Sequence, residues 1–184
     1  MAWIVIIGIV LIVGFILFLL MLSFGGLWLK AYLANAKIPF FNLIGIKLRG
    51  VQVSRIVDSY ISAIQAGVQG LTTQELESVY LVRRNPKDVS VNVTAMITAF
   101  KAALPITFAQ LQEHHFASGN VTNVVNALIA ANRANIDLDL DVARAIDLAG
   151  RNVLEAVQTC VNPKVIDCPV DKTATVAAVA MDGI

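Results

Sequence analysis

The chain has 184 residues, a formal net charge of +1 and 57% hydrophobic residues, which leaves room for one apolar anchor and one modest domain. Its two cysteines, Cys160 and Cys168, are too few for a disulfide framework. The small basic patch of Arg83, Arg84 and Lys87 does not indicate a nucleic-acid-binding protein.

The N-terminal region is apolar, and the first charged side chain is Lys30. A helix over residues 2–22 would be about 31 Å long, which matches a hydrocarbon core of ~30 Å. A cleaved signal peptide is the alternative, but no positive residue precedes the apolar run. The one candidate cleavage motif, Ala34-Asn35-Ala36, also lies beyond Lys30. We therefore expect residues 1–29 to form a transmembrane anchor.

The charge that follows this region is one-sided, because five basic residues precede the first acidic residue, Asp58. They are Lys30, Lys37, Lys47, Arg49 and Arg55. Positive charge directly behind a membrane helix marks the cytoplasmic side. We therefore expect a cell-membrane protein whose body faces the cytoplasm, with these cations near anionic lipid headgroups.

Residues 30–53 are interpreted as a basic interfacial or re-entrant membrane segment. The apolar run from Ile38 to Ile46 would cover ~14 Å as a helix, less than half of a bilayer, and Pro39 and Gly45 interrupt it. Flanking lysines and aromatic side chains are typical of the headgroup region. A buried strand of the folded domain is the alternative. The predicted membrane-interface residues are Trp28, Lys30, Tyr32, Lys37, Phe40, Phe41, Lys47 and Arg49.

From residue 71 onward the sequence repeats itself. Residues 71–85, 106–120 and 138–152 align, and each segment runs from a leading aliphatic residue to an asparagine. The segment starts differ by 35 and 32 residues, a period typical of stacked helix pairs. Residues 55–67 are expected to be a lone second helix before the first full unit. We therefore predict a domain of repeated helix pairs over residues 54–162.

Each unit should contain a short helix and then a longer amphipathic one. Thr72 with Glu75 and Thr107 with Gln110 have the spacing of capping boxes, and Asp139 or Asp141 can cap the third unit. The longer helices carry apolar stripes, which we assign to the core rather than to a binding groove. The stripes comprise Met96, Ile97, Phe100 and Leu104; Val121, Val124, Val125, Leu128 and Ile129; and Val153, Leu154, Val157 and Val161.

The pattern changes after Pro163, which cannot continue a helical hydrogen-bond ladder. Residues 164–166 and 173–181 are β-branched and alanine-rich, and Asp182-Gly183 is a hairpin signal with one residue after it. We expect residues 163–184 to be a β segment that begins a truncated further domain. The predicted fold is therefore mainly α, with a transmembrane helix, repeated helix pairs and a short C-terminal β segment.

No enzyme motif, cofactor site or metal site is evident in the sequence. His114 and His115 would point about 100° apart on a helix, so they cannot chelate one ion from one face. We expect His115 near the apolar stripe and His114 in solvent. Asp137, Asp139 and Asp141 lack the glycine and terminal glutamate of a calcium loop, so helix capping is the better interpretation.

Several runs resemble the bacterial flotillin-like family of the SPFH (prohibitin-like) superfamily. They are residues 124–136, 145–158 and 161–166, with the shorter runs 46–49, 74–77 and 179–184. The resemblance implies a membrane protein of ordered lipid microdomains that forms homo-oligomers and has a small NfeD-type membrane partner. It also implies that residues 81–116 are an extra helix pair and that the chain stops at the start of the SPFH domain.

These observations together predict a non-enzymatic membrane scaffold that organises microdomains and associated protein complexes. Its predicted partner is the lipid bilayer, in particular anionic lipids. Nucleic acid is not a predicted partner. The alternative is a membrane-tethered helical-repeat module that binds a protein or a peptide.

Overall fold

The computed structural model describes residues 2–161, and every regular element within them is an α-helix. Shorter and longer helices alternate after the first one, and the last two described helices have nine residues each. In chain order they are α1 (Ala2–Leu33), α2 (Phe40–Leu48), α3 (Val53–Gln65), α4 (Thr73–Arg83), α5 (Pro86–Lys101), α6 (Phe108–Phe116), α7 (Val121–Arg133), α8 (Leu140–Leu148) and α9 (Val153–Val161).

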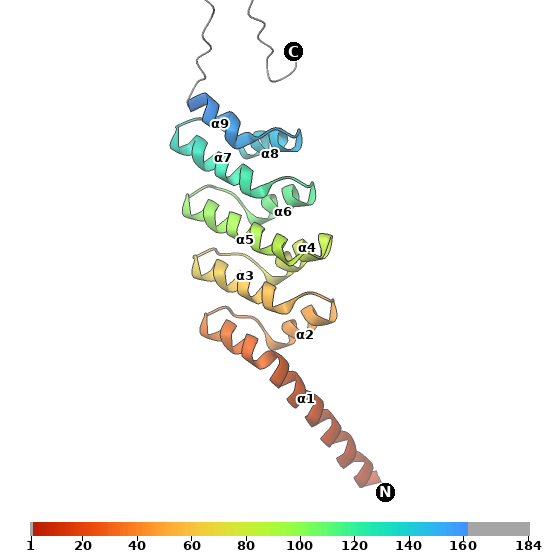
Figure 1. Ribbon diagram of the computed structural model, residues 1–184. Coiled ribbons are helices and arrows are strands. Elements are labelled where there is room, and N and C mark those ends of the chain that lie inside the picture. Colours follow the sequence, from red (N-terminus) through yellow and green to blue (C-terminus); the bar gives the residue numbers. More distant parts are fainter. Residues whose placement is uncertain (1, 162–184) are drawn as a thin grey trace, which may run out of the picture.

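The helices form a stack in which each layer repeats the one before it (Figure 1). Helices α3, α5, α7 and α9 lie one above another, and each contacts the next. The shorter helices α2, α4, α6 and α8 occupy a second row, and each contacts the longer helices before and after it. This is the arrangement of an α-solenoid, in which every unit buries its apolar face against its neighbours.

The helices begin at the capping residues that the sequence indicated. Both capping boxes are present, with Thr72 and Glu75 at the start of α4 and Thr107 and Gln110 at the start of α6. Asp139 caps α8. The asparagine that closes each predicted segment caps the next longer helix, through Asn85 on α5, Asn120 on α7 and Asn152 on α9.

The longer helices end in one repeated turn. At the ends of α1, α3, α5 and α7 a left-handed residue is followed by an amide that donates to a carbonyl five residues back, at 2.8–3.1 Å. This hydrogen bond is the signature of the Schellman turn. The accepting residues are all buried alanines, namely Ala31, Ala63, Ala99 and Ala131. The same turn therefore redirects the chain into each shorter helix.

The core consists of aliphatic columns that pass from layer to layer. In the shorter helices, equivalent positions bury Leu43, Leu76, Leu111 and Ala143. In α7 the predicted stripe is confirmed as core, because Val124, Val125 and Leu128 are at most 5% exposed. Phe100 and Val161 differ from the prediction, since they are 45% and 56% exposed.

Residues 38–46 supply the loop and most of α2, the shorter helix of the first layer. Ile38, Leu43 and Ile46 are buried against the stack, whereas Phe41 on the opposite side is 79% exposed. The segment is helical, so the alternative of a buried strand is wrong. Its apolar residues thus divide between the stack and the surface, and the interfacial role of the surface part stays a prediction.

Two parts of the predicted fold class need correction. No helix among residues 2–161 has the length and hydropathy of a membrane crossing, so the predicted transmembrane helix is wrong.

Helix α1 also does not stop at residue 29. Ala31 is buried, and Phe24, Leu27 and Trp28 pack on the core, because the end of α1 forms the first layer of the stack. The predicted β segment, residues 163–184, lies outside the described residues, and residues 2–161 contain no strand.

Candidate membrane-contact surface

Helix α1 presents an apolar surface over most of its described length. Five consecutive residues, 9–13, are all exposed, and so are Trp3, Phe15 and Phe18. Successive helical residues are about 100° apart, so this exposure extends around the helix. Exposed apolar surfaces larger than a few hundred Å² mark sites of protein or membrane contact. The surface of α1 therefore has the character of a site of protein or membrane contact.

The junction of α1 and α2 gathers aromatic side chains around a recess of about 450 Å³. On α1, the rings of Trp28 and Tyr32 are stacked with their centroids 5.5 Å apart. On α2, Phe40 and Phe41 meet edge to face at 6.2 Å. Lys37, in the loop between the helices, also lines the recess. Five of the eight predicted membrane-interface residues are thus brought together at one place.

The remaining three predicted residues, all cations, lie elsewhere. Lys30 on α1 pairs with Asp58 on α3 at 2.5 Å. Arg49, at the end of α2, pairs with the buried carboxylate of Glu77 on α4 at 2.7 Å. Lys30 and Arg49 therefore connect neighbouring layers, while both side chains stay more than half exposed. The third, Lys47, is exposed in the last turn of α2.

Sequence reasoning missed the residues that complete this surface. Ala36, Ile38 and Pro39 line the recess, although Ile38 and Pro39 fell within the apolar run that drew attention to the segment. It also missed Asp58 and Glu77, the acidic partners of two cations. Both lie 28 residues from their partners, which is too far along the chain for a local pattern to indicate the pairing.

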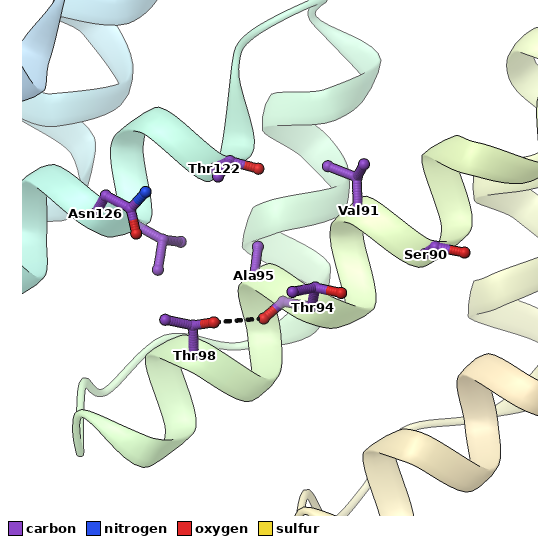
Figure 2. Close-up of a pocket in the computed structure, with 8 residues that line it drawn as sticks. Ser90, Val91, Thr94, Ala95, Thr98, Thr122 and Asn126 are labelled. Carbon is purple, nitrogen blue, oxygen red and sulfur yellow. Dashed lines mark hydrogen bonds between the residues drawn. The ribbon is translucent and has the colours of Figure 1, made fainter.

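A second recess, of about 210 Å³, lies between α5 and α7 (Figure 2). Figure 2 shows Ser90, Thr94 and Thr98 along α5 and Thr122 and Asn126 on α7, all lining the recess. The hydroxyl of Thr98 donates a hydrogen bond to the backbone carbonyl of Thr94 at 2.8 Å. The lining carries hydroxyl, amide and methyl groups but no ionisable side chain. This recess can accept a small side chain from a partner, but it holds no acid–base pair.

The two histidines lie on α6, and both are buried. The prediction for His115 is confirmed, whereas the solvent position expected for His114 is wrong, since His114 is 1% exposed. His114 Nε2 lies 2.8 Å from Asp147 Oδ2, and His115 Nε2 lies 3.4 Å from Asp88 Oδ2. Burial lowers the pKa of His115, and Arg83 acts in the same direction, while Asp88 opposes it. Each imidazole faces its own carboxylate, so the two do not converge on one ion.

Comparison with known proteins places these features in a family context. A family model described as flotillin-like protein FloA matches residues 4–108 and 82–184. Residues 82–108 fall within both matches, which is consistent with a repeated segment. No solved structure matches the chain.

Three curated relatives, each named flotillin-like protein FloA, illustrate the similarity. The protein of Dictyoglomus turgidum is 41% identical over 183 residues, which cover 95% of this chain and 44% of the relative. The protein of Protochlamydia amoebophila is 38% identical over 162 residues, which cover 88% of this chain and 37% of the relative. The protein of Staphylococcus aureus is 51% identical over 126 residues, which cover 68% of this chain and 35% of the relative. The chain therefore spans less than half the length of the relatives it matches.

Proposed function

The chain belongs to the bacterial family of flotillin-like FloA proteins, and on that basis we propose that it is a non-enzymatic scaffold subunit of membrane microdomains. In this proposal the surface formed by α1 and the α1–α2 recess contacts lipid, and the helical stack presents sites to associated protein complexes. The observation that carries the proposal is the gathering of Trp28, Tyr32, Lys37, Phe40 and Phe41 beside the exposed apolar side chains of α1.

The chemistry of the recess suits the boundary between lipid tails and headgroups. Tryptophan and tyrosine have an apolar ring and a polar group, and they concentrate at this boundary. A lysine near an anionic surface contributes about 1 kcal/mol of attraction, and a fully buried large apolar side chain about 1.5–3 kcal/mol. Two phenylalanines next to one lysine therefore favour binding dominated by apolar burial, with charge selecting anionic lipid.

The proposed orientation places the stack on the cytoplasmic side. Anionic lipids give the cytoplasmic leaflet its negative surface potential, and it attracts basic segments beside a membrane. Lys37 and Lys47 are exposed on the α1–α2 layer, where they could meet that leaflet. We also propose that the chain forms homo-oligomers and binds a small NfeD-type membrane protein.

A membrane-tethered binding module is the second candidate, and the recess in Figure 2 favours it. The recess is small, and its rim of hydroxyl and amide groups could hold a partner's backbone while its methyl groups accept a side chain. Thr94→Trp should fill it and abolish such binding without affecting lipid contact. A scaffold that uses other surfaces would keep its protein partners in this variant.

The lipid contact can be tested with the protein's own fluorescence, because the chain has two tryptophans, Trp3 and Trp28. In the variant Trp3→Phe, Trp28 reports alone. We expect its emission in anionic vesicles to be quenched by bromine placed on the acyl chains near the headgroups, and less by bromine at the chain ends. Trp28 emission that is insensitive to both probes would contradict the proposed contact.

A matched pair of α2 variants separates the recess from general apolarity. Phe41 lines the recess and is 79% exposed, whereas Leu48 lies outside it and is 82% exposed. Phe41→Ser should reduce the quenching of Trp28, and Leu48→Ser should leave it nearly unchanged. Equal effects of the two substitutions would show that the recess has no special part in membrane contact.

A further inference from the structure

The two adjacent histidines connect α6 to the layers on either side of it. His114 faces Asp147 on α8, in the following layer, while His115 faces Asp88 on α5, in the preceding one. Neighbouring positions on a helix diverge by about 100°, which allows the two rings to reach opposite neighbours. His114 is hydrogen-bonded to Asp147, whereas His115 Nε2 and Asp88 Oδ2 face each other at 3.4 Å and neither has a hydrogen-bond partner among the described residues.

His114 occupies a position that is aliphatic in the other shorter helices. The equivalent residues, each three positions after the buried column residue, are Ile46 in α2, Val79 in α4 and Ile146 in α8. Asp147 Oδ2 accepts from His114 and also from the backbone amide of Asn120 at 2.6 Å. The carboxylate is therefore held in place, and a polar pair replaces an aliphatic contact at this joint.

His115 lies between charges of both signs. Asp88 on α5 directs Oδ2 at the imidazole, because its Oδ1 accepts from Asn85 at 2.9 Å. Arg83 on α4 adds positive charge near the imidazole of His115. His114, the residue before it on α6, acts on the pKa of His115 in the same direction as Arg83. The ring is buried, and a charged imidazole there loses hydration that the single carboxylate only partly replaces.

These two residues are the only histidines in the chain. Imidazole is the only side chain whose ordinary pKa lies between about 5 and 8, so histidine is where a protein of this composition changes charge near neutral pH. Here both histidines are buried at one joint in the middle of the stack, with α1 on one side and α9 on the other.

We propose that His115 and Asp88 form a pH-sensitive joint between α6 and α5, which opens in mild acid as the buried imidazole gains a proton and water, while the hydrogen bond between His114 and Asp147 holds α6 to α8. The joint then lies between a part of the stack that includes α1 and a part that includes α9, and α5 and α7 remain in contact across it. This inference is independent of the proposed membrane role, since it rests on contacts within the stack.

Hydrogen exchange of the full chain in detergent micelles tests the joint directly. Amide exchange, corrected for its intrinsic dependence on pH, should accelerate in α6 and in the first turns of α5 between about pH 8 and pH 5. His115→Gln should abolish that acceleration, while the matched variant His114→Gln should retain it. Acceleration that persists in His115→Gln, or no acceleration in the unmodified chain, would overturn the proposal.

Two further measurements keep the test decisive if a glutamine variant folds poorly. Asp88→Asn removes the carboxylate that faces His115, so the response to acid should become larger. In the unmodified chain, the imidazole carbon shifts of His115 should titrate with the same midpoint as the exchange in α6. A smaller response in Asp88→Asn, or two clearly different midpoints, would count against the joint.

Discussion

The imidazole of His114 lies directly against the backbone of Gly119. A Cβ atom at position 119 would lie 2.2 Å from both Cε1 and Nε2 of the ring, far inside van der Waals contact. The ring cannot easily move aside, because it is buried and its Nε2 lies 2.8 Å from Asp147. Glycine is required at this position by close packing.

Gly119→Ala should therefore destabilise the stack by about 1–3 kcal/mol, the usual cost of overpacking a well-packed core. Unfolding of the full chain in detergent, followed by circular dichroism, measures the change. Gly45→Ala is the matched control, because its Cβ would meet Arg49 at 3.7 Å, which is ordinary contact. The control should gain up to about 1 kcal/mol from better helix propensity. Equal stability of the two variants would contradict the contact between Gly119 and His114.

Leu128→Ala should cost about 2–5 kcal/mol, because it removes a buried side chain of α7 and leaves a cavity in the core. Leu48→Ala makes the same chemical change at a position that is 82% exposed, and its effect should stay within about 0.5 kcal/mol. Denaturant titration of both variants gives the comparison. A Leu128 variant as stable as the control would mean that the α7 stripe faces a partner.

Acid should lower the stability of the whole chain through His115. Burial lowers the pKa of His115 below its ordinary value of 6.5, so the unfolded chain binds this proton at a higher pH than the folded chain does. Protonation then favours unfolding, and the free energy of unfolding falls as the pH drops from about 6.5 to the folded pKa. The melting temperature as a function of pH measures the loss, and His115→Gln should flatten the curve. A curve unchanged by that substitution would place the titration elsewhere.

Membrane orientation can be read from Cys160, which is exposed on α9. If the stack faces the cytoplasm, a membrane-impermeant thiol reagent should label Cys160 only after intact cells are permeabilised. The variant Cys168→Ser confines labelling to Cys160 and leaves the described residues unchanged. Labelling of Cys160 in intact cells would reverse the proposed orientation.

The repeated helix pairs could be predicted because their signals are local in the sequence. Thr107 and Gln110 are three residues apart, and Val124, Val125 and Leu128 lie within two turns of one helix, so neither pattern depends on the rest of the fold. Trp28 and Tyr32, one helical turn apart, and the adjacent Phe40 and Phe41 could be grouped from the sequence, and their membrane-interface role stays a prediction. The first layer was missed because its leading segment, residues 38–46, was assigned to the membrane surface.

Other features were decided by tertiary structure alone. His114 is buried because Asp147, 33 residues away, satisfies its Nε2 in the next layer, and Lys30 meets Asp58 across the first two layers. The same stacking continues α1 past residue 29 and buries Ala31. By itself the sequence determined the helix starts and the apolar columns, which arise from interactions within a few residues. Which polar groups pair across layers depended on the stack, because burying a charge or a hydrogen-bonding group is tolerated only where a distant partner is brought within reach.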